Sequence, residues 1–590
     1  MSPPTRGSMA SKAWGRVRAE EGLSETLGWA LGTLLLVTAP AVVGVNAVLG
    51  NSLGETDNHL WMFWRASQRL LGRSEALGNA PVGIHIPLMD PINLPAYLPG
   101  ALVSPELGWR TLIWFNVGLA MLGGYLLARQ WTSPRGARVA MVACGATPFL
   151  SGVLDFGISE SWTLGWFLLH TALLVAHGRD GKAWQAVGAG LCLGAVGLSG
   201  WYHASYGLLW EAMLVPALLV RWRRPGLVWQ GLIGALMVVP ALLAFLPQRS
   251  MWEPRWRLPS PGPPGPRPDW GELPVFGVDL LTFVVPHPEV VSPSKATYLG
   301  LVVLALCVVG LVRAPKKTAG LVAMAVPFLV LALGYWPSIG GKAWGFPGPA
   351  KWLVDRVPAL TGMSHWFRAT GPAAVLVAVA AGVGAGAVCA QRPWLTRVLL
   401  VAVLADGLVG SPTAWPRPAY DVNVPASISV LAGEGGLVQL PFDNGRTDFS
   451  DDPPRLYNRW QVGHGRPVSE NYEGVDALLA QSALVAPIDQ ACLVSTTLPP
   501  YYQPPPEMRG LGTPSKSKGR AMAQALADDG FDWIVLHRDR CRVTVTPIRA
   551  LDKVLGQGID LPGGDRAWPL RPGLRDETEA RIAAWTAAQE

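Results

Sequence analysis

Long apolar runs alternate with shorter polar connections through the first 410 residues of the chain. Each run spans about 16 to 23 residues, near the length that an α-helix needs to cross the hydrocarbon layer of a membrane. The pattern predicts eleven membrane-spanning helices. They lie at residues 27–49, 107–128, 138–154, 159–176, 183–200, 204–220, 227–246, 297–312, 318–334, 370–390 and 395–410.

Basic residues follow a second pattern, because every second connection between the apolar runs is short and rich in Lys or Arg. Cytoplasmic loops of membrane proteins carry this excess of cations. We therefore predict a multi-pass protein of the bacterial plasma (inner) membrane, with a cytoplasmic N-terminus and an extracytoplasmic chain from residue 411 onward. The cations are Arg6, Lys12, Arg16, Arg18, Arg129, Arg135, Arg138, Arg179, Lys182, Arg221, Arg223, Arg224, Arg313, Lys316, Lys317, Arg392 and Arg397.

Composition agrees with this topology, since 50% of the residues are hydrophobic and only 15% are charged. An ordinary soluble protein carries more charge. The formal charge of +7 follows from the cytoplasmic loops. Nucleic acid is not an expected partner, because no soluble segment shows a basic face. We predict an α-helical polytopic membrane protein with a cytoplasmic tail at 1–25, a membrane domain at 26–410 with outer loops at 50–106, 247–296 and 335–369, and a soluble extracytoplasmic α/β domain at 411–590.

The C-terminal domain shows signals for both strands and helices. "GGLVQLPFD" and "GFDWIVLHRD" each hold a short β-favouring run, and "KGRAMAQALADDG" is typical of a helix. Prolines in "PTAWPRPAYDVNVP", residues 412–425, separate this domain from the last membrane helix. Cys492 and Cys541 are the two cysteines of the domain, and on the oxidising side of the membrane they are expected to form a disulfide.

The stretch "GETDNHLWMFWRASQRLLGR", residues 54–73, places acids directly outside the first apolar run. Its arginines recur every four residues opposite an apolar arc, which predicts an amphipathic helix at the membrane surface. Two interpretations of the acids stay open. Either Asp57 or Asn58 caps the helix, or Glu55 and Asp57 face a lipid-accessible cavity as a base or metal ligands.

Six further segments follow in a distinctive order: "INLPAYLPGALVSPELGWRTLIWFNVGLAMLGGYLLARQWT", "DFGISESWTLGWFLLHTALL", "LSGWYHASYGLLW", "DLLTFVVPHPE", "HWFRATGPAAVL" and "LVQLPFD". This order gives the chain a resemblance to the membrane glycosyltransferases of the GT-C superfamily, which use polyprenyl-phosphate sugars. It implies that an acid of the first outer loop serves as catalytic base or assists metal binding, which Asp57 matches, with Glu55 two residues before it. It implies a second acid from the next outer loop, Asp155 or Glu160, and leaves a divalent cation open as a cofactor.

Sugar transfer from a lipid phosphate also requires cations that stabilise the departing phosphate. Arg65, Arg110 and Arg368 lie at predicted outer membrane boundaries, where a guanidinium can bind phosphate. The alternative interpretation is that these side chains reach from the helix ends into the lipid headgroups. His203 and His365 are candidates for orienting a phosphate or acceptor, with simple hydrogen bonding at the interface as the alternative.

Three functions remain open from the sequence. The first is a transferase that moves a sugar from a polyprenyl-phosphate donor in the membrane lipid to a glycan, lipid or protein acceptor. The second is a transporter of lipid-linked glycans, which needs polar groups deep in the helices, and Glu211 and Asp406 are among the few present. The third is a non-catalytic assembly factor. Because Glu55 and Asp57 are present, we favour the transferase.

Overall fold

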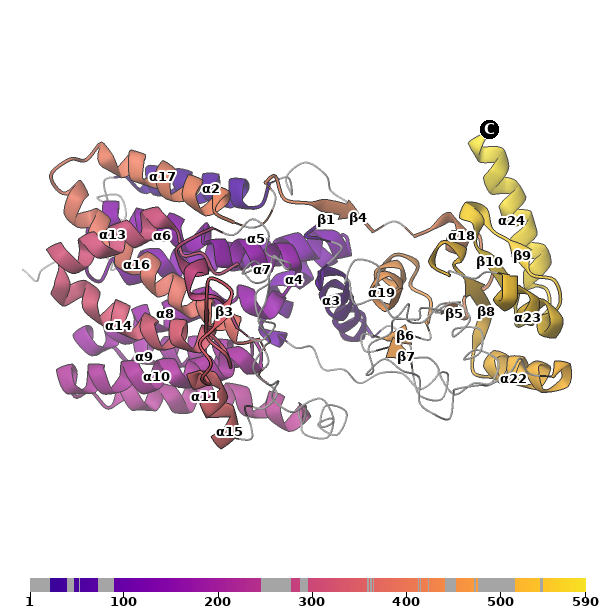
Figure 1. Ribbon diagram of the computed structural model, residues 1–590, viewed down its shortest axis with the longest axis horizontal. Helices are drawn as coiled ribbons and strands as arrows, with labels where there is room; N and C mark the ends of the chain where they lie inside the picture. The colour runs from indigo at the N-terminus through magenta and orange to yellow at the C-terminus, as the bar shows by residue number, and fades with distance from the viewer. Residues whose placement is uncertain are drawn as a thin grey trace, which may run out of the picture. The chain divides into compact units, whose positions relative to one another are not determined.

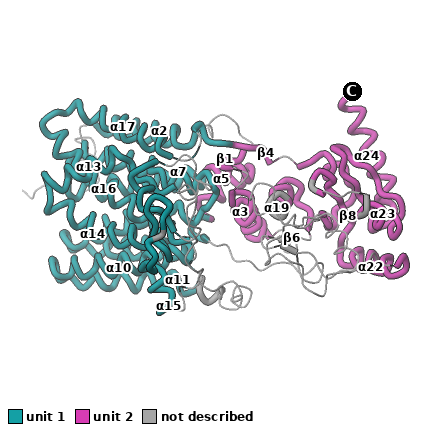
Figure 2. The backbone as a smooth tube through the Cα atoms, in the orientation of Figure 1, with its two compact units in different colours: residues 1–44, 89–93, 111–418 teal, residues 45–88, 94–110, 419–590 magenta. Residues whose placement is uncertain are grey.

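The computed structural model describes most of the chain and divides it into two compact units (Figure 1, Figure 2). Unit 1 comprises residues 1–44, 89–93 and 111–418, and unit 2 comprises residues 45–88, 94–110 and 419–590. The described residues are 22–39, 47–51, 54–72, 90–245, 277–286, 296–357, 360, 363, 365–411, 413, 415–422, 424–440, 453–468, 470–471, 474–475, 515–541 and 545–590.

Unit 1 is a helical bundle, as the apolar runs predict. Each of the eleven predicted runs contains a helix, and within the described residues five helical segments are long and apolar enough to cross a membrane. These are Pro105–Ala128, Pro134–Phe156, Trp201–Trp222, Pro315–Ala332 and Trp366–Cys389. The chain is therefore a multi-pass membrane protein.

The helices of unit 1 have several 3₁₀ turns between them. They are α2 (Leu23–Val37), η1 (Pro91–Asn93), α5 (Pro105–Ala128, whose first residues belong to unit 2), α6 (Pro134–Gly145), α7 (Pro148–Phe156), η2 (Ser159–Trp162), α8 (Leu164–Asp180), α9 (Ala183–Gly197), α10 (Trp201–Trp222), α11 (Gly226–Phe245), η4 (Leu280–Phe283), α13 (Leu301–Arg313), α14 (Pro315–Ala332), α15 (Pro349–Arg356), η7 (Trp366–Ala369), α16 (Thr370–Cys389) and α17 (Leu395–Val409), with the hairpin β2 (Ser338–Ile339) and β3 (Lys342–Ala343).

Helix α16 is the core of this bundle. It packs against α6, α13 and α14, and its residues are buried almost throughout (Figure 1). Its sequence is rich in Gly and Ala, which lets neighbouring backbones approach closely. A Cβ on Gly382 would lie 2.5 Å from the Cβ of Ala140, and one on Gly384 would lie 2.0 Å from the carbonyl oxygen of Leu306.

The first apolar run differs from its prediction as a single helix over residues 27–49. Helix α2 ends at Val37, and the run finishes in a strand, β1 (Ala47–Leu49). Pro40 follows the helix end, where a proline cannot continue the helical hydrogen bonds. Strand β1 pairs antiparallel with β4 (Ala419–Asp421), so the backbone donors and acceptors of this segment are used in a ladder instead of a helix.

Unit 2 is built around a four-stranded sheet with the order β5-β8-β10-β9. Strand β5 runs parallel to β8, and β10 runs antiparallel to both β8 and β9. The elements of the unit are β1, α3 (Thr56–Leu70), α4 (Leu94–Ala101), β4, α18 (Ala426–Ser429), β5 (Gly436–Leu440), α19 (Pro453–His464), β6 (Glu470–Asn471), β7 (Gly474–Val475), α22 (Lys516–Asp528), β8 (Phe531–Leu536), η11 (Arg538–Arg540), α23 (Val545–Leu555), β9 (Ile559–Asp560), η12 (Pro562–Gly564), β10 (Arg566–Pro569) and α24 (Leu574–Gln589).

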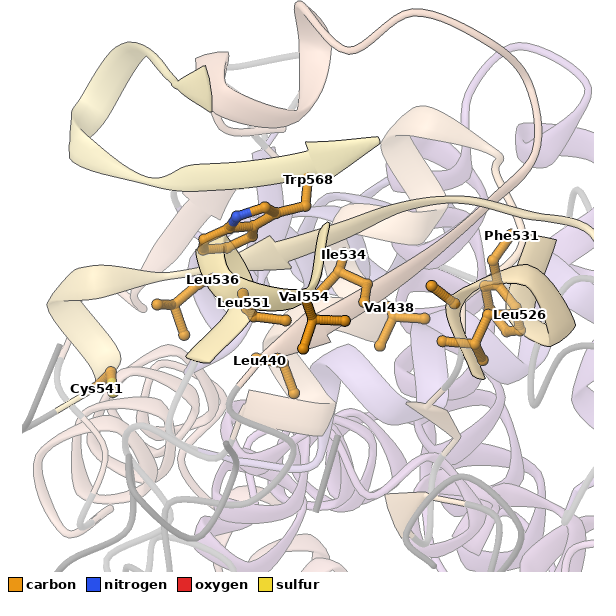
Figure 3. Packing of buried hydrophobic residues seen from close by; sticks show 11 residues of the cluster. Val438, Leu440, Leu526, Phe531, Ile534, Leu536, Cys541, Leu551, Val554 and Trp568 are labelled. Atoms are coloured by element: carbon orange, nitrogen blue, oxygen red, sulfur yellow. The ribbon is translucent and has the colours of Figure 1, made fainter. Parts of the chain in front are cut away.

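Both faces of this sheet are buried, which explains the almost continuous apolar sequence of its strands. On one face, Val438, Ile534 and Leu536 pack against α22 and α23, as Figure 3 shows. On the other face, Leu437 and Trp533 pack with α18, α19 and α24. The predicted strands in "GGLVQLPFD" and "GFDWIVLHRD" and the helix before the second are confirmed.

Candidate functional site

A buried ion pair joins two short turns that precede long helices in unit 1. Glu160 lies in η2, before α8, and Arg368 lies in η7, before α16. Arg368 Nη1 donates to Glu160 Oε1 at 2.6 Å, and the two side chains are 11% and 9% exposed. Removing one partner of a buried pair leaves an uncompensated charge, at a cost of about 3 to 5 kcal/mol. The pair therefore fixes a cation and a carboxylate at one point of the bundle.

The start of α10 is attached to the same turn. The guanidinium carbon of Arg368 lies 4.7 Å from the centre of the Tyr202 ring. The Tyr202 hydroxyl accepts from the His365 backbone N–H at 3.0 Å and lies 3.4 Å from His365 Nδ1. Stacking on an aromatic face leaves the edges of a guanidinium available for other partners.

Two further polar side chains of α10, those of His203 and Tyr206, are fully buried. His203 and Tyr206 are 0% and 1% exposed, and their ring centres lie 6.1 Å apart. Within the described residues, neither ring nitrogen of His203, nor the Tyr206 hydroxyl, nor Nε of Arg368 has a hydrogen-bond partner. Burying such groups unpaired is costly. This set, which we call the donor cluster (His203, Tyr206 and Arg368), is therefore suited to a polar or anionic group.

Asp90 is a further acid of unit 1, and the sequence analysis did not single it out. Its carboxyl is fully buried, and Asn93 Nδ2 donates to its Oδ2 at 2.9 Å. Asn116 Nδ2 in turn donates to Asn93 Oδ1 at 2.9 Å. Burial, followed by the negative charge of Glu160, raises the pKa of Asp90 to about 8. Its place in the first outer loop, directly before "PINLP", was the signal that sequence reasoning could have used.

Asp155, the other predicted acid of unit 1, ends α7 and is buried. Arg417, which was not predicted, donates to the carbonyl oxygen of Ser151, one turn before Asp155, at 2.6 Å. Burial lowers the pKa of Arg417 to about 10, and the charge of Asp155 opposes that shift. Asp155 therefore balances the positive charge of Arg417, which binds the backbone of α7, the helix that carries Asp155.

Asp57 lies in the first turn of α3 in unit 2 and is 2% exposed. Its Oδ1 accepts from the Tyr420 hydroxyl at 2.6 Å, and its Oδ2 lies 3.7 Å from Arg459 Nε. Burial and then the charge of Asp57 raise the pKa of Tyr420 well above its ordinary value, so the phenol keeps its proton and donates. Partial positive charge at the helix start also favours a carboxylate here.

The capping interpretation of this segment is wrong. The residue before the first helical position is Glu55, and it makes no capping hydrogen bond through its side chain. Asp57 and Asn58 lie inside the helix, and Asn58 Nδ2 donates to Glu55 Oε2 at 3.3 Å. Asp57 thus contacts groups that are distant in the sequence, Tyr420 and Arg459.

Two predicted phosphate-binding arginines of unit 2 have other surroundings. Arg65 is buried and its guanidinium lies 5.3 Å from the Trp61 ring, and burial, then Arg69, lowers its pKa to about 10. Arg110 donates through Nε and Nη2 to the carbonyl oxygen of Ala47, at 2.9 and 2.6 Å. Arg110 therefore holds strand β1.

The structure thus brings Glu160, His203, His365 and Arg368 into one region of unit 1. Asp57, Glu55, Arg65 and Arg110 belong to unit 2. A cavity that Asp57 shares with at least one of the acids Asp155 and Glu160, and with at least one of the predicted arginines, stays a prediction. Among the described residues, no group of three or more His, Cys, Asp or Glu side chains is placed to hold a metal ion. Cys541 is buried and disulfide-bonded, whereas Cys492, its predicted partner, lies outside the described residues.

No family model and no curated protein matches the chain. Solved structures do. ArnT from Cupriavidus metallidurans in the apo state is 12% identical with a TM-score of 0.47, over 96% of this chain and 99% of that one. The same protein bound to undecaprenyl phosphate is 12% identical with a TM-score of 0.44, over 94% and 98%.

A third solved structure is the oligosaccharyltransferase of Archaeoglobus fulgidus in the apo form. It is 12% identical with a TM-score of 0.44, over 88% of this chain and 70% of that one.

Proposed function

We propose that the protein is a membrane glycosyltransferase that transfers a sugar from a polyprenyl-phosphate donor to an extracytoplasmic acceptor. The donor cluster carries this proposal. His203 and Tyr206 are buried and Arg368 is 11% exposed, and each presents a buried hydrogen-bonding atom without a partner in the described part of the chain. A phosphate offers several strong acceptors and negative charge, which suits these groups.

The acids and the cations have distinct roles in this reaction. An acceptor oxygen or nitrogen attacks the anomeric carbon, the bond from that carbon to the phosphate oxygen breaks, and the phosphate leaves with the electron pair. A carboxylate takes the acceptor proton, and hydrogen-bond donors stabilise the phosphate as it departs. We assign the phosphate to the donor cluster, with Glu160 orienting Arg368 through their 2.6 Å hydrogen bond. The proton transfer is assigned to Asp57 on the sequence resemblance alone.

Phosphate binding can be measured without knowing the sugar. We expect undecaprenyl phosphate to bind the purified full-length protein in lipid nanodiscs, and His203→Gln, Tyr206→Phe and Arg368→Lys each to weaken binding about tenfold or more. A hydrogen bond to a charged group contributes about 1.5 to 3 kcal/mol. Arg179→Gln is the control, because Arg179 is exposed and bonds to its neighbour Asp180. Wild-type affinity in all three variants would exclude the donor cluster as the phosphate site.

The base is tested separately with a panel of polyprenyl-phosphate hexoses and pentoses, by measuring release of polyprenyl phosphate. We expect Asp57→Asn to lower the rate by roughly a hundredfold or more, because the amide cannot take a proton. A thermal unfolding curve and undecaprenyl phosphate binding, both close to wild type, would show that the variant is folded. If this variant transfers sugar at the wild-type rate, Asp57 is not the base.

A further inference from the structure

The surroundings of Asp57 come from the C-terminal part of the sequence. Helix α3, which carries Asp57, packs against α19 within unit 2. Trp61 of α3 donates through Nε1 to Gln461 of α19, and both side chains are fully buried. Two elements separated by hundreds of residues are therefore joined by a buried contact next to the carboxylate.

Tyr420 is fixed independently of this helix pair. It lies in β4, where it is paired with Val48 of β1 in an antiparallel ladder. Its hydroxyl reaches Asp57 Oδ1 at 2.6 Å, and the guanidinium carbon of Arg459 lies 4.9 Å from the centre of its ring. The phenol and the guanidinium thus form one stacked pair that faces the two carboxylate oxygens.

The two oxygens have different partners. Oδ1 accepts a short hydrogen bond from a phenol that remains protonated, because burial and the charge of Asp57 raise the pKa of Tyr420. Oδ2 faces Arg459 at 3.7 Å, which is longer than a hydrogen bond, so Arg459 acts on it mainly through charge.

Helix α4, which also packs against α3, presents Tyr97, whose ring lies 5.3 Å from Phe63.

We propose that the C-terminal region, residues 419–590, supplies two positioning residues for the reaction, Tyr420 and Arg459. They hold the Asp57 carboxylate in the orientation and charge state of a base. This inference rests on the proposed function, in which Asp57 takes the acceptor proton. Tyr420 selects the orientation by binding Oδ1. Arg459 stabilises the ionised carboxylate, and its stacking on the Tyr420 ring fixes the two side chains relative to each other. The C-terminal region is then a component of the transferase and not only a separate binding module.

The pH profile distinguishes this role from a purely structural one. Removing the positive charge or the hydrogen bond makes the ionised carboxylate less stable, so it binds a proton at higher pH. In Arg459→Gln and Tyr420→Phe we expect the acid limb of kcat/KM to shift to higher pH and kcat to fall about tenfold. The KM for the lipid donor should stay unchanged, because neither residue belongs to the donor cluster. Arg459→Lys keeps the charge and should restore most of the profile.

Arg581→Gln is the matched control, since Arg581 lies in the same unit and pairs with Glu577 on the exposed face of α24. We expect its kinetics to match wild type. If Asp57→Asn abolishes transfer while Arg459→Gln and Tyr420→Phe keep the wild-type kcat and pH profile, the positioning role is overturned and the base stands. If Asp57→Asn transfers normally, both the base and the positioning role are overturned.

Discussion

Asp90 shows how a single residue can be set by contacts that lie far from it in sequence. Its carboxyl is enclosed by Asn93, by Ser159 and by the charge of Glu160. Desolvation disfavours its ionised form, and a neighbouring carboxylate acts in the same direction. The pKa of about 8 means that Asp90 is mostly protonated at neutral pH and adds little charge beside the Glu160 and Arg368 pair.

This shift predicts a pH-dependent stability. The unfolded chain releases the Asp90 proton near pH 4, whereas the folded protein keeps it until about pH 8. Between these values the folded state binds more protons, so the contribution of Asp90 to stability falls as pH rises and is fully lost above pH 8. Asp90→Asn mimics the neutral carboxyl and removes the pH-dependent contribution of Asp90 to stability. We expect the thermal midpoint of the variant, relative to wild type, to be higher at pH 8 than at pH 5. A difference that stays constant with pH would contradict the prediction.

Residue types and their places along the chain were enough to predict part of the candidate site. Glu160, His203, His365 and Arg368 all flank the ends of apolar runs, and helix ends on one side of a bundle converge. The partners of Asp57 could not be predicted in this way. Tyr420 is 363 residues away from it, and only the pairing of β1 with β4 brings the two together.

Helix packing depends on glycine at the scale of elements. The central helix α16 meets α13 so closely that a methyl group on Gly384 would lie 2.0 Å from the Leu306 carbonyl oxygen and 2.8 Å from the Gly310 nitrogen. Both are backbone atoms of α13, which cannot rotate away as a side chain can. Close approach of this kind increases van der Waals contact between helices where lipid gives no hydrophobic driving force.

Gly384→Ala should therefore lower the stability of the folded protein, by about 1 to 3 kcal/mol, because the two helices must separate or shift to admit the methyl group. Gly320→Ala is the matched control: Gly320 is also within a helix, α14, and nothing lies within 4 Å of the added carbon. We expect an unchanged or slightly raised thermal midpoint for this control. The measurement is thermal unfolding of both purified variants in the same detergent. Equal midpoints would show that α13 and α16 are not in close contact.

Hydrophobic runs predicted where the helices occur, and short β-favouring runs predicted β5 and β8. The exception, β1, has the same apolar composition as a membrane helix. Its conformation is decided by its partner β4, which the local sequence does not reveal. Element type is thus predictable where a segment satisfies its own hydrogen bonds, and less so where a distant strand supplies them.

At the scale of the whole molecule, the division into units follows contacts and not chain order. Residues 45–88 and 94–110 are grouped with residues 419–590. The sequence pattern instead predicts that they belong to the membrane domain, mostly to its outer loop at 50–106. The β1–β4 ladder and the packing of α3 on α19 account for this grouping. Neither contact has a signature in the sequence, so the places of the helices in unit 1 were predictable while the membership of the units was not.

Within unit 1, the basic connections are brought together in space. Lys317 Nζ donates to the carbonyl oxygen of Trp131 at 2.9 Å, which joins the first turn of α14 to the connection before α6. Arg224 Nε donates to the carbonyl oxygen of Gly178 at 2.7 Å, which joins the connection before α11 to the last turn of α8. Glu25, at the start of α2, pairs with Arg138 and Arg397. Connections that the sequence assigns to one side therefore contact each other in pairs.

These contacts support a testable topology for the full chain. Loops rich in Lys and Arg remain in the cytoplasm, so the connection at Arg224 should be cytoplasmic. Residues after α17 then lie outside, and the C-terminus at Glu590 with them. We expect a fluorescent reporter that folds only in the cytoplasm to be active when fused after Arg224 and inactive after Glu590, and alkaline phosphatase to give the reverse. The fusion after Glu590 retains all the helices of this sequence, whereas the fusion after Arg224 removes those that follow it. Activity of the same reporter at both positions would mean that the chain crosses the membrane an even number of times between them, and the predicted alternation of basic loops would be wrong.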